Sequence, residues 1–235
     1  MLRAILFDCN GVIADDEPIH YLLIKQILKE QGIDVEQAEY NARYLHFDDR
    51  HCFEAVLRDR GRKAPPALVA DLVERKAAAY RAAVPGRLTI FPGVKELARA
   101  AAERYPLAVA SGARREEIAY ILNEAGLFSY FRVIVGSEDV LNAKPDPEPF
   151  LIALERLNAA RRGKDDALAP AQCLVIEDSV GGVAGAKAAG MRCLAVTNTY
   201  PAEALAAADR VVSSLEEVTL PALEALFLHP SARPS

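Results

Sequence analysis

The sequence predicts an α/β fold in which a core built around a parallel sheet is interrupted by an all-helical segment. Two patterns carry this prediction. Short apolar runs alternate with helix-like segments at the start of the chain and again from residue 88 onward, which is typical of parallel βαβ units. Between them, residues 16–87 carry apolar side chains at helical spacing. A chain of 235 residues, 51% of them hydrophobic, can bury one full core and a smaller second one.

The core is expected to comprise residues 1–15 and 88–228, and the helical insert residues 16–87. Within the insert, one helix is predicted to begin at Pro65-Pro66 and to end before Pro85-Gly86. Residues 229–235 lack any apolar period, which predicts a flexible tail. The core strands are predicted at 3–8, 107–111, 132–135, 172–177 and 192–196, with a weaker edge strand near 210–213, and the core helices at 93–104, 114–125, 147–159 and 180–189.

The charge balance argues against large anionic partners. A net charge of -5 gives no basic field for nucleic acid or an anionic membrane surface, so a small-molecule partner is favoured. The chain opens without an apolar stretch of signal-peptide length and has no later run of membrane-spanning length, so we expect a cytoplasmic protein, with a monomer favoured. Four cysteines without CxxC spacing or a histidine cluster are expected to be reduced thiols in or near the core: Cys9, Cys52, Cys173 and Cys193.

Chemically distinctive residues follow successive predicted strands. Asp8 ends the first strand, Ser111-Gly112 the second, and Glu177-Asp178 the fourth, while Lys144 lies in the loop after the third. Each alone is more typical of a turn, a helix cap or a solvated loop than of a functional site. Because ligands of open parallel sheets bind outside the carboxyl ends of the strands, the ordered set predicts one shared pocket.

This set of residues is suited to phosphoryl transfer. Asp8 can attack phosphorus as a nucleophile, and Asp8 with Asp178 can hold a hard divalent cation, for which Mg²⁺ is the expected choice. The Ser111 hydroxyl and the N–H groups from Gly112 onward can bind phosphate oxygens at a helix N-terminus, and Lys144 supplies positive charge.

The ordered motifs resemble those of the haloacid dehalogenase-like hydrolase superfamily. Asp8-Cys9-Asn10-Gly11-Val12 is similar to its first motif, and Ser111, Lys144 and Glu177-Asp178 to the following three. The stretch 177–191 looks particularly like the branch that contains β-phosphoglucomutase-like and phosphoglycolate phosphatase-like enzymes. The resemblance implies a Rossmann-like core with a helical cap inserted after the first motif. It also implies a phosphatase of small phosphorylated metabolites, with Mg²⁺ bound by Asp8, the backbone carbonyl of Asn10 and Asp178, and with Glu177 in support.

Asn10 departs from this family pattern, in which an aspartate protonates the leaving oxygen and later activates water. An amide cannot exchange a proton at neutral pH, and a positioned acid/base commonly contributes ~10²- to 10⁴-fold in rate. We therefore expect slow turnover, least impaired for acyl or aryl phosphates and most for sugar or alkyl phosphates. A weakly active phosphate-binding or regulatory protein is the alternative. The Asn10-Gly11 pair also raises the hypothesis of slow deamidation to aspartate, against a rigid turn that protects the amide.

The helical cap is where the resemblance implies substrate selection. The segment His46-Phe47-Asp48-Asp49-Arg50 is the candidate, in which Arg50 either reaches an anionic group of the substrate or is a solvated charge. His20 is similar to a histidine common in the branch, and can equally be an interfacial packing residue.

A carbon–phosphorus or carbon–halogen hydrolase is a further alternative, because such relatives also lack the second aspartate. Carbon–phosphorus cleavage in the family uses a cap lysine as a Schiff base, which residues 48–50 do not offer. Four other lysines are predicted to be exposed helix charges: Lys25, Lys29, Lys63 and Lys76.

Overall fold

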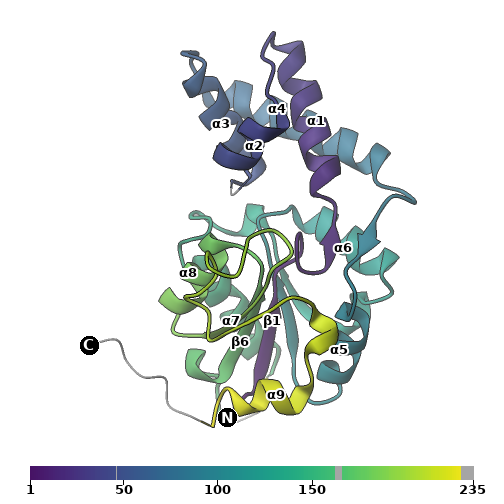
Figure 1. Cartoon of the computed structure of the whole chain (residues 1–235), viewed down its shortest axis with the longest axis vertical. Coiled ribbons are helices and arrows are strands. Elements are labelled where there is room, and N and C mark those ends of the chain that lie inside the picture. The colour runs from purple at the N-terminus through teal and green to yellow at the C-terminus, as the bar shows by residue number, and fades with distance from the viewer. Residues whose placement is uncertain (46, 162–165, 229–235) are drawn as a thin grey trace. The chain divides into compact units, whose positions relative to one another are not determined.

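The computed structural model describes residues 1–45, 47–161 and 166–228 (Figure 1). The described chain divides into two compact units. One, the core unit, consists of Met1–Ala14 and the chain from Ile90 onward, and the other, the helical unit, of Asp15–Thr89. The His46 of the predicted specificity segment and the predicted tail at 229–235 lie outside the described residues.

The described part of the core unit contains a six-stranded sheet in the order β5-β4-β1-β6-β7-β8. Every pairing in this sheet is parallel. The predicted α/β fold with a parallel sheet is therefore confirmed, and the predicted strand positions agree within about two residues, the usual uncertainty of such boundaries. The strands are β1 (Ala4–Phe7), β4 (Leu107–Ala110), β5 (Phe131–Val135), β6 (Cys173–Glu177), β7 (Arg192–Val196) and β8 (Arg210–Val212).

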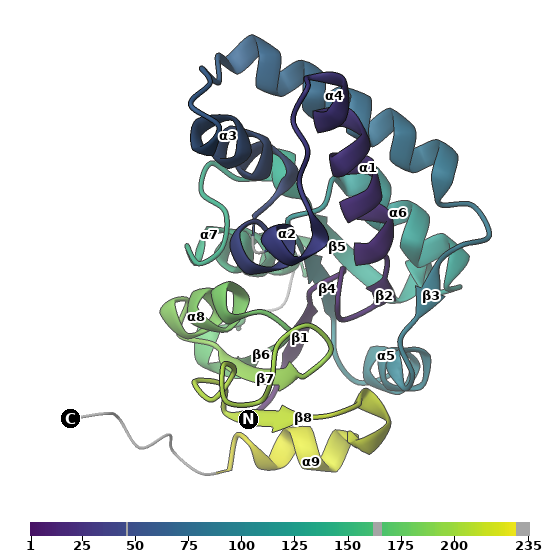
Figure 2. The same ribbon diagram turned by 45° about the horizontal axis from the view of Figure 1, so that its top comes forward.

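Helices cover both faces of this sheet, α7 and α8 on one side and α5 and α6 on the other (Figure 2). Strands buried on both faces read as continuous apolar runs, which is why β1 and β4 are apolar throughout. On one face, Leu6 and Val175 share a buried cluster with Phe150 of α7 and Val183 of α8. The helices of the core unit are α5 (Val94–Ala102), α6 (Arg115–Glu124), α7 (Glu148–Ala160), α8 (Val180–Ala188) and α9 (Leu220–Ala225), with short 3₁₀ helices at Phe128–Tyr130, Ser137–Asp139, Pro170–Gln172 and Leu215–Glu217.

The strand order places β1 at the centre of the sheet, between β4 and β6. Phe7 pairs with Val109 of β4 on one side and with Ile176 of β6 on the other. Because all three strands run in the same direction, the residues that follow them emerge at one edge of the sheet. This register brings the chemistry-bearing loops together.

The helical unit has its own apolar core. Its largest fully buried side chains include Tyr44, Phe53 and Leu72, and burying each such side chain contributes roughly 1.5 to 3 kcal/mol. The Asp48 carboxylate caps α3 by accepting a hydrogen bond of 2.8 Å from the His51 backbone N–H. The helices are α1 (Glu17–Glu30), α2 (Gln37–Arg43), α3 (Asp49–Asp59) and α4 (Pro66–Ala83).

The chain passes from one unit to the other through two very short strands that the sequence did not predict. They are β2 (Ala14–Asp15) and β3 (Thr89–Ile90), and they pair with each other. Beyond them, the Phe91 N–H donates to the Ile13 carbonyl oxygen over 3.1 Å. The segments entering and leaving the helical unit therefore run side by side.

The cysteine prediction is confirmed, and one lysine prediction is wrong. All four cysteines are free and buried. Lys76, predicted to be an exposed helix charge, is fully buried in the helical unit. Lys76 lies four residues after buried Leu72 and four before buried Tyr80, so all three side chains share the inner face of α4.

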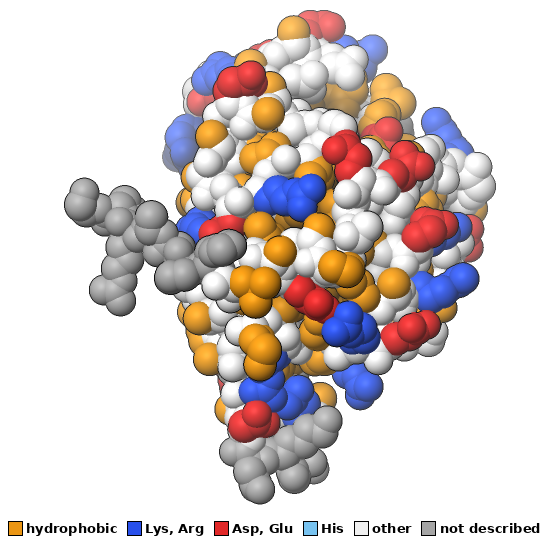
Figure 3. Space-filling view, turned by 60° about the horizontal axis from the view of Figure 1, so that its bottom comes forward, with side chains coloured by type: hydrophobic (Ala, Val, Ile, Leu, Met, Phe, Trp, Pro, Cys, Tyr) orange, Lys and Arg blue, Asp and Glu red, His pale blue; other side chains and the backbone are white. Residues whose placement is uncertain are grey.

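On the face of the molecule drawn in Figure 3, Lys and Arg side chains are interspersed with Asp and Glu. Among the described residues, no helix combines the length and the apolar character needed to cross a membrane.

Candidate active site

Asp8 begins the loop that leaves the central strand β1. Its backbone N–H continues the sheet pairing by donating to the Ile176 carbonyl oxygen over 2.9 Å. The side chain is nearly buried, and burial raises the pKa of the Asp8 carboxyl to about 6 even though the Lys144 ammonium opposes the rise. A buried carboxylate at a strand tip is a suitably placed nucleophile when a cation lies beside it.

Lys144 provides that cation. Its Nζ lies 2.6 Å from Oδ1 of Asp8 and 2.5 Å from Oε1 of Glu177, so the ammonium bridges the tips of β1 and β6. Nζ also lies 5.1 Å from the centre of the Phe150 ring. Burial alone would lower the pKa of the Lys144 ammonium, but the Asp8 and Glu177 carboxylates outweigh burial and hold this pKa above its usual value. Lys144 is therefore charged at neutral pH.

Glu177 is held rigidly at the end of β6. Its Oε2 accepts hydrogen bonds from the backbone N–H groups of Asp178 and Ser179 and from the Ser179 hydroxyl. The carboxylate occupies space left by Gly182 on the first turn of α8, because a Cβ at Gly182 would lie 1.9 Å from the Glu177 Cδ. Glu177 thus gives the Lys144 ammonium a second, well-anchored carboxylate partner besides Asp8.

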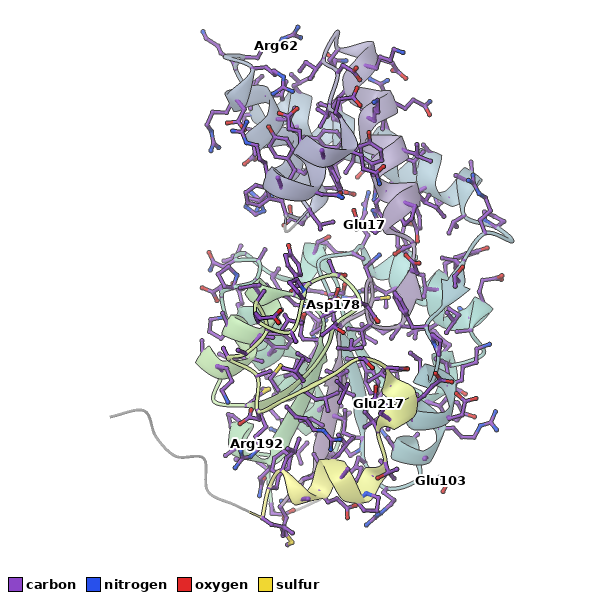
Figure 4. All side chains as sticks on the ribbon, in the orientation of Figure 1. Glu17, Arg62, Glu103, Asp178, Arg192 and Glu217 are labelled. Carbon is purple, nitrogen blue, oxygen red and sulfur yellow. The ribbon has the colours of Figure 1, made fainter. Side chains whose placement is uncertain are left out.

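Asp178 follows Glu177 and lies at the carboxyl edge of the sheet (Figure 4). Its Oδ2 accepts a short hydrogen bond from the Thr199 hydroxyl. A Cβ at Gly11 would lie 1.9 Å from this same oxygen, and Gly11 has φ of +77°, so glycine is required where the first loop approaches Asp178. Burial, together with the Glu177 and Asp8 carboxylates, raises the pKa of Asp178 well above its usual range.

The three carboxylates form a cluster of oxygen ligands that could hold a hard cation. One oxygen each of Asp8, Glu177 and Asp178 lies within 4.8 Å of the others, and all three residues are buried. Among the described residues, the Lys144 ammonium forms ion pairs with two of these three carboxylates, so negative charge is in excess when all three are ionised. An all-oxygen, anionic donor set suits Mg²⁺. Burial is the main cause of the raised pKa values of Asp8 and Asp178, and the neighbouring carboxylates add to the rise.

Ser111 lies next to Asn10 at this edge of the sheet. The Ser111 hydroxyl lies 3.5 Å from Oδ1 of Asn10 and accepts a hydrogen bond of 3.3 Å from the Ala113 N–H. Ser111 is buried, whereas the neighbouring Gly112 is exposed in the turn that leads to α6. The Ser111 hydroxyl, from the loop after β4, thus lies beside the Asn10 side chain in the loop after β1.

Asn198 and Thr199 belong to this region and were missed by the sequence prediction. The Asn198 side-chain nitrogen donates to the Gly11 carbonyl oxygen over 2.7 Å, and Thr199 holds Asp178. Both follow β7, the neighbour of β6. The polar run Thr197-Asn198-Thr199 directly after an apolar strand was the available signal.

His20 and Arg50, the predicted substrate contacts, belong to the helical unit. His20 is buried, with Nε2 3.1 Å from Oδ2 of Asp16 and Nδ1 2.6 Å from Nζ of Lys76. Arg50 is exposed, and its guanidinium lies 3.1 Å from Nε2 of His51. His20 therefore forms part of an internal network of this unit, and Arg50 lies on its surface.

Lys76 joins that network as an ion pair. Its Nζ lies 2.9 Å from Oδ2 of Asp49 and 5.0 Å from the centre of the Tyr80 ring. The Tyr80 hydroxyl donates to Oδ2 of Asp16 over 2.5 Å. Because an ammonium only donates hydrogen bonds, Nδ1 of His20 accepts from Lys76, and the ring proton resides on Nε2, facing Asp16. A Schiff-base lysine requires a neutral amine, which the contact with Asp49 disfavours.

Comparisons with known proteins agree with the geometry. A family model described as haloacid dehalogenase-like hydrolase matches residues 2–190. β-Phosphoglucomutase from Bacillus subtilis is 28% identical over 225 residues, covering 93% of this chain and 92% of the relative. A phosphoglycolate phosphatase from Yersinia pestis is 28% identical over 200 residues, covering 85% and 82%.

Among solved structures, a mutant of CbbY from Rhodobacter sphaeroides in complex with xylulose-(1,5)bisphosphate superimposes with a TM-score of 0.83 at 26% identity. The match covers 95% of this chain and 99% of that one. The two enzyme types that the motif resemblance implied are thus both present among the relatives.

Proposed function

We propose that this chain, which belongs to the haloacid dehalogenase-like hydrolases and is a phosphatase, removes phosphate from a small phosphorylated metabolite. In this proposal the reaction passes through an aspartyl-phosphate on Asp8, and Mg²⁺ is the cofactor. One observation carries the proposal. The Lys144 ammonium lies between the Asp8 and Glu177 carboxylates, with Asp178 beside them, so a nucleophile, a fixed cation and a set of metal-binding oxygens are adjacent.

The proposed roles follow from charge and position. Asp8 attacks phosphorus, while the Lys144 ammonium and the Ser111 hydroxyl hold the phosphate oxygens and offset their charge. An ammonium about 4 Å from a phosphate oxygen contributes several kcal/mol at an effective dielectric near 20. Asp8, the Asn10 carbonyl and Asp178, supported by Glu177, would hold Mg²⁺, which when bound neutralises charge on the phosphate. Asn10 leaves proton transfer without its usual carrier.

The substrate class is proposed from the relatives. One is named for the phosphorylated sugar that it isomerises, another for phosphoglycolate, and a third has been crystallised with a sugar bisphosphate. We assign a small phosphorylated metabolite to this chain. Arg50 and His20 remain candidate residues for substrate selection. We also propose that the protein is a cytoplasmic monomer.

The test is phosphate release from a panel of acyl, aryl, alkyl and sugar phosphates, with Mg²⁺ or with excess EDTA. We expect release that requires Mg²⁺ and disappears in Asp8→Asn. Release that EDTA leaves unchanged would refute the metal assignment, and release that survives in Asp8→Asn would refute the nucleophile. Halide release from haloacids without metal would favour the carbon–halogen alternative.

A phosphate-binding or regulatory protein is the second candidate, favoured by Asn10. It predicts phosphate binding, measured by calorimetry, in a protein that releases phosphate from no substrate even after Asn10→Asp.

A further inference from the structure

In the described part of the core unit, the carboxylates beside Asp8 are engaged with other groups and do not replace the acid/base that Asn10 lacks. Glu177 is committed to Lys144, Ser179 and two backbone N–H groups, and Asp178 to Thr199. No histidine lies among the described residues of the core unit. Two of the three buried carboxylates at this edge are thus held by other groups, and the third is the nucleophile itself.

Asn10 is also held in a turn that protects it as an amide. Deamidation needs the next backbone nitrogen, that of Gly11, to attack the side-chain carbonyl carbon of Asn10. The Gly11 N–H donates to the Ala14 carbonyl oxygen over 2.9 Å, and the Gly11 carbonyl oxygen accepts from Asn198 over 2.7 Å. The backbone N–H and the backbone carbonyl of Gly11 are therefore both hydrogen-bonded, which supports a stable asparagine at position 10.

We propose that Asp8 takes a phosphoryl group from acyl phosphates and retains it, so that the protein accumulates as a long-lived aspartyl-phosphate. The inference rests on the proposed function, because it uses the same nucleophile and the same site. It differs in the outcome, which is a stored phosphoryl group in place of rapid hydrolysis.

Phosphorylation by an acyl phosphate does not need the missing acid. An oxygen of Asp8 bonds to phosphorus, the bond from phosphorus to the acyl oxygen breaks, and its electron pair leaves with the carboxylate product. That carboxylate is stable without a proton at neutral pH. An alkyl phosphate would instead expel an alkoxide, which requires protonation and which Asn10 cannot supply.

Hydrolysis of the phosphorylated protein does need the missing base. Water must lose a proton as its oxygen bonds to phosphorus, after which the bond from phosphorus to Asp8 breaks and the carboxylate is restored. Asn10 cannot take that proton. Meanwhile, Lys144 at 2.6 Å from Asp8 neutralises charge on the phosphoryl group and stabilises the phosphorylated state. In the transfer to Asp8, the bond that breaks and the bond that forms both join phosphorus to a carboxyl oxygen. The stored phosphoryl group therefore keeps its transfer potential.

The experiment measures the intact mass of the full chain after incubation with Mg²⁺ and acetyl phosphate and rapid desalting. We expect a gain of one phosphoryl group that peptide mapping locates on residue 8 and that hydroxylamine removes, as it does for acyl phosphates. Asp8→Asn should gain nothing, and the natural chain given an alkyl phosphate should gain nothing. In Asn10→Asp, the modified form should decay ~10²-fold faster or more.

The outcomes separate this inference from the proposed function. If Asn10→Asp hydrolyses phosphates while the natural chain turns over acetyl phosphate as fast and carries no modification, the inference is overturned and the phosphatase assignment stands. If neither protein releases phosphate from any substrate or gains mass, both fall. A mass gain that persists in Asp8→Asn also overturns the inference, as does an aspartate found at position 10 in the mapped natural chain.

Discussion

The hydroxyl of Ser111 lies 3.5 Å from the side-chain oxygen of Asn10. An aspartate has the shape of an asparagine and would place a carboxylate oxygen beside the same hydroxyl. With either residue at position 10, the Ser111 hydroxyl would have an oxygen acceptor beside it.

We predict that Asn10→Asp raises the turnover of alkyl phosphates by ~10²- to 10⁴-fold, because it restores a group that carries a proton in both chemical steps. The gain should be smaller for acyl and aryl phosphates, whose leaving groups need less protonation. Steady-state phosphate release on matched pairs of substrates measures the difference. Equal gains for both classes would show that protonation of the leaving group is not limiting, and that Asn10 slows only hydrolysis of the phosphorylated protein, a step that both classes share.

The stability of the protein should depend on pH and divalent cation together. The pKa of Asp8 is raised by burial from 3.8 to about 6, and that of Asp178 is also raised, so the folded metal-free protein binds these protons more tightly than the unfolded chain. The contribution of these two carboxyls to the free energy of unfolding should therefore fall as pH rises from about 4 through about 6.

Bound Mg²⁺ should reverse that loss, because it stabilises the ionised carboxylates. Thermal unfolding with and without Mg²⁺ tests this, with an expected increase in Tm that is larger at about pH 7.5 than at about pH 5. Asp178→Asn should reduce the increase. An effect of Mg²⁺ that is independent of pH would contradict a carboxylate site.

Two adjacent glycines of α8 should respond differently to alanine. A Cβ at Gly182 would lie about 2 Å from the Glu177 carboxylate, whereas a Cβ at Gly181 would meet its nearest atom at 3.9 Å. Gly182→Ala should displace Glu177, loosen Lys144 and lower phosphatase activity, with a weaker effect of Mg²⁺ on Tm.

Gly181→Ala is the matched control. It should preserve activity and stabilise the protein by roughly 0.5 to 1 kcal/mol, because alanine has a higher helix propensity than glycine. Activity assays and urea unfolding of both variants provide the comparison. Equal activity of the two variants would show that the position of Glu177 is unimportant.

Lys76 should stabilise the helical unit through its buried contacts. Lys76→Met removes the partner of Asp49 and of His20 Nδ1, and breaking a buried ion pair commonly costs ~3 to 5 kcal/mol. Lys29→Met, on the exposed surface of α1, should change the free energy of unfolding by less than about 0.5 kcal/mol. Hydrogen exchange should localise the loss of protection to residues 15–89, and a loss confined to the core unit would contradict this role.

Most of the core fold could be predicted because its strands are short, buried runs without polar interruption. The grouping of Asp8, Ser111, Lys144 and Glu177-Asp178 followed from parallel topology, which brings successive strand ends to one edge. Strands β2 and β3 could not be predicted, since two residues are too few to show an alternating pattern.

Within the site, Thr199 and Asn198 escaped prediction because their roles depend on side-chain contacts with distant residues, Asp178 and Gly11. Lys76 was misassigned although its spacing from Leu72 and Tyr80 indicated an inner position. A charged residue type outweighed the periodic pattern in that prediction, whereas in the structure the Asp49 carboxylate compensates the buried charge.

The pairing of β2 with β3 means that the inserted segment leaves and rejoins the core at points that are neighbours in space, although the whole insert separates them along the chain. Such an arrangement makes the insert modular: another segment with similarly spaced ends can replace it without altering the path of the sheet. Under the proposed function, changes in the insert that alter which substrate is accepted can then accumulate separately from changes in the core that alter the attack on phosphorus.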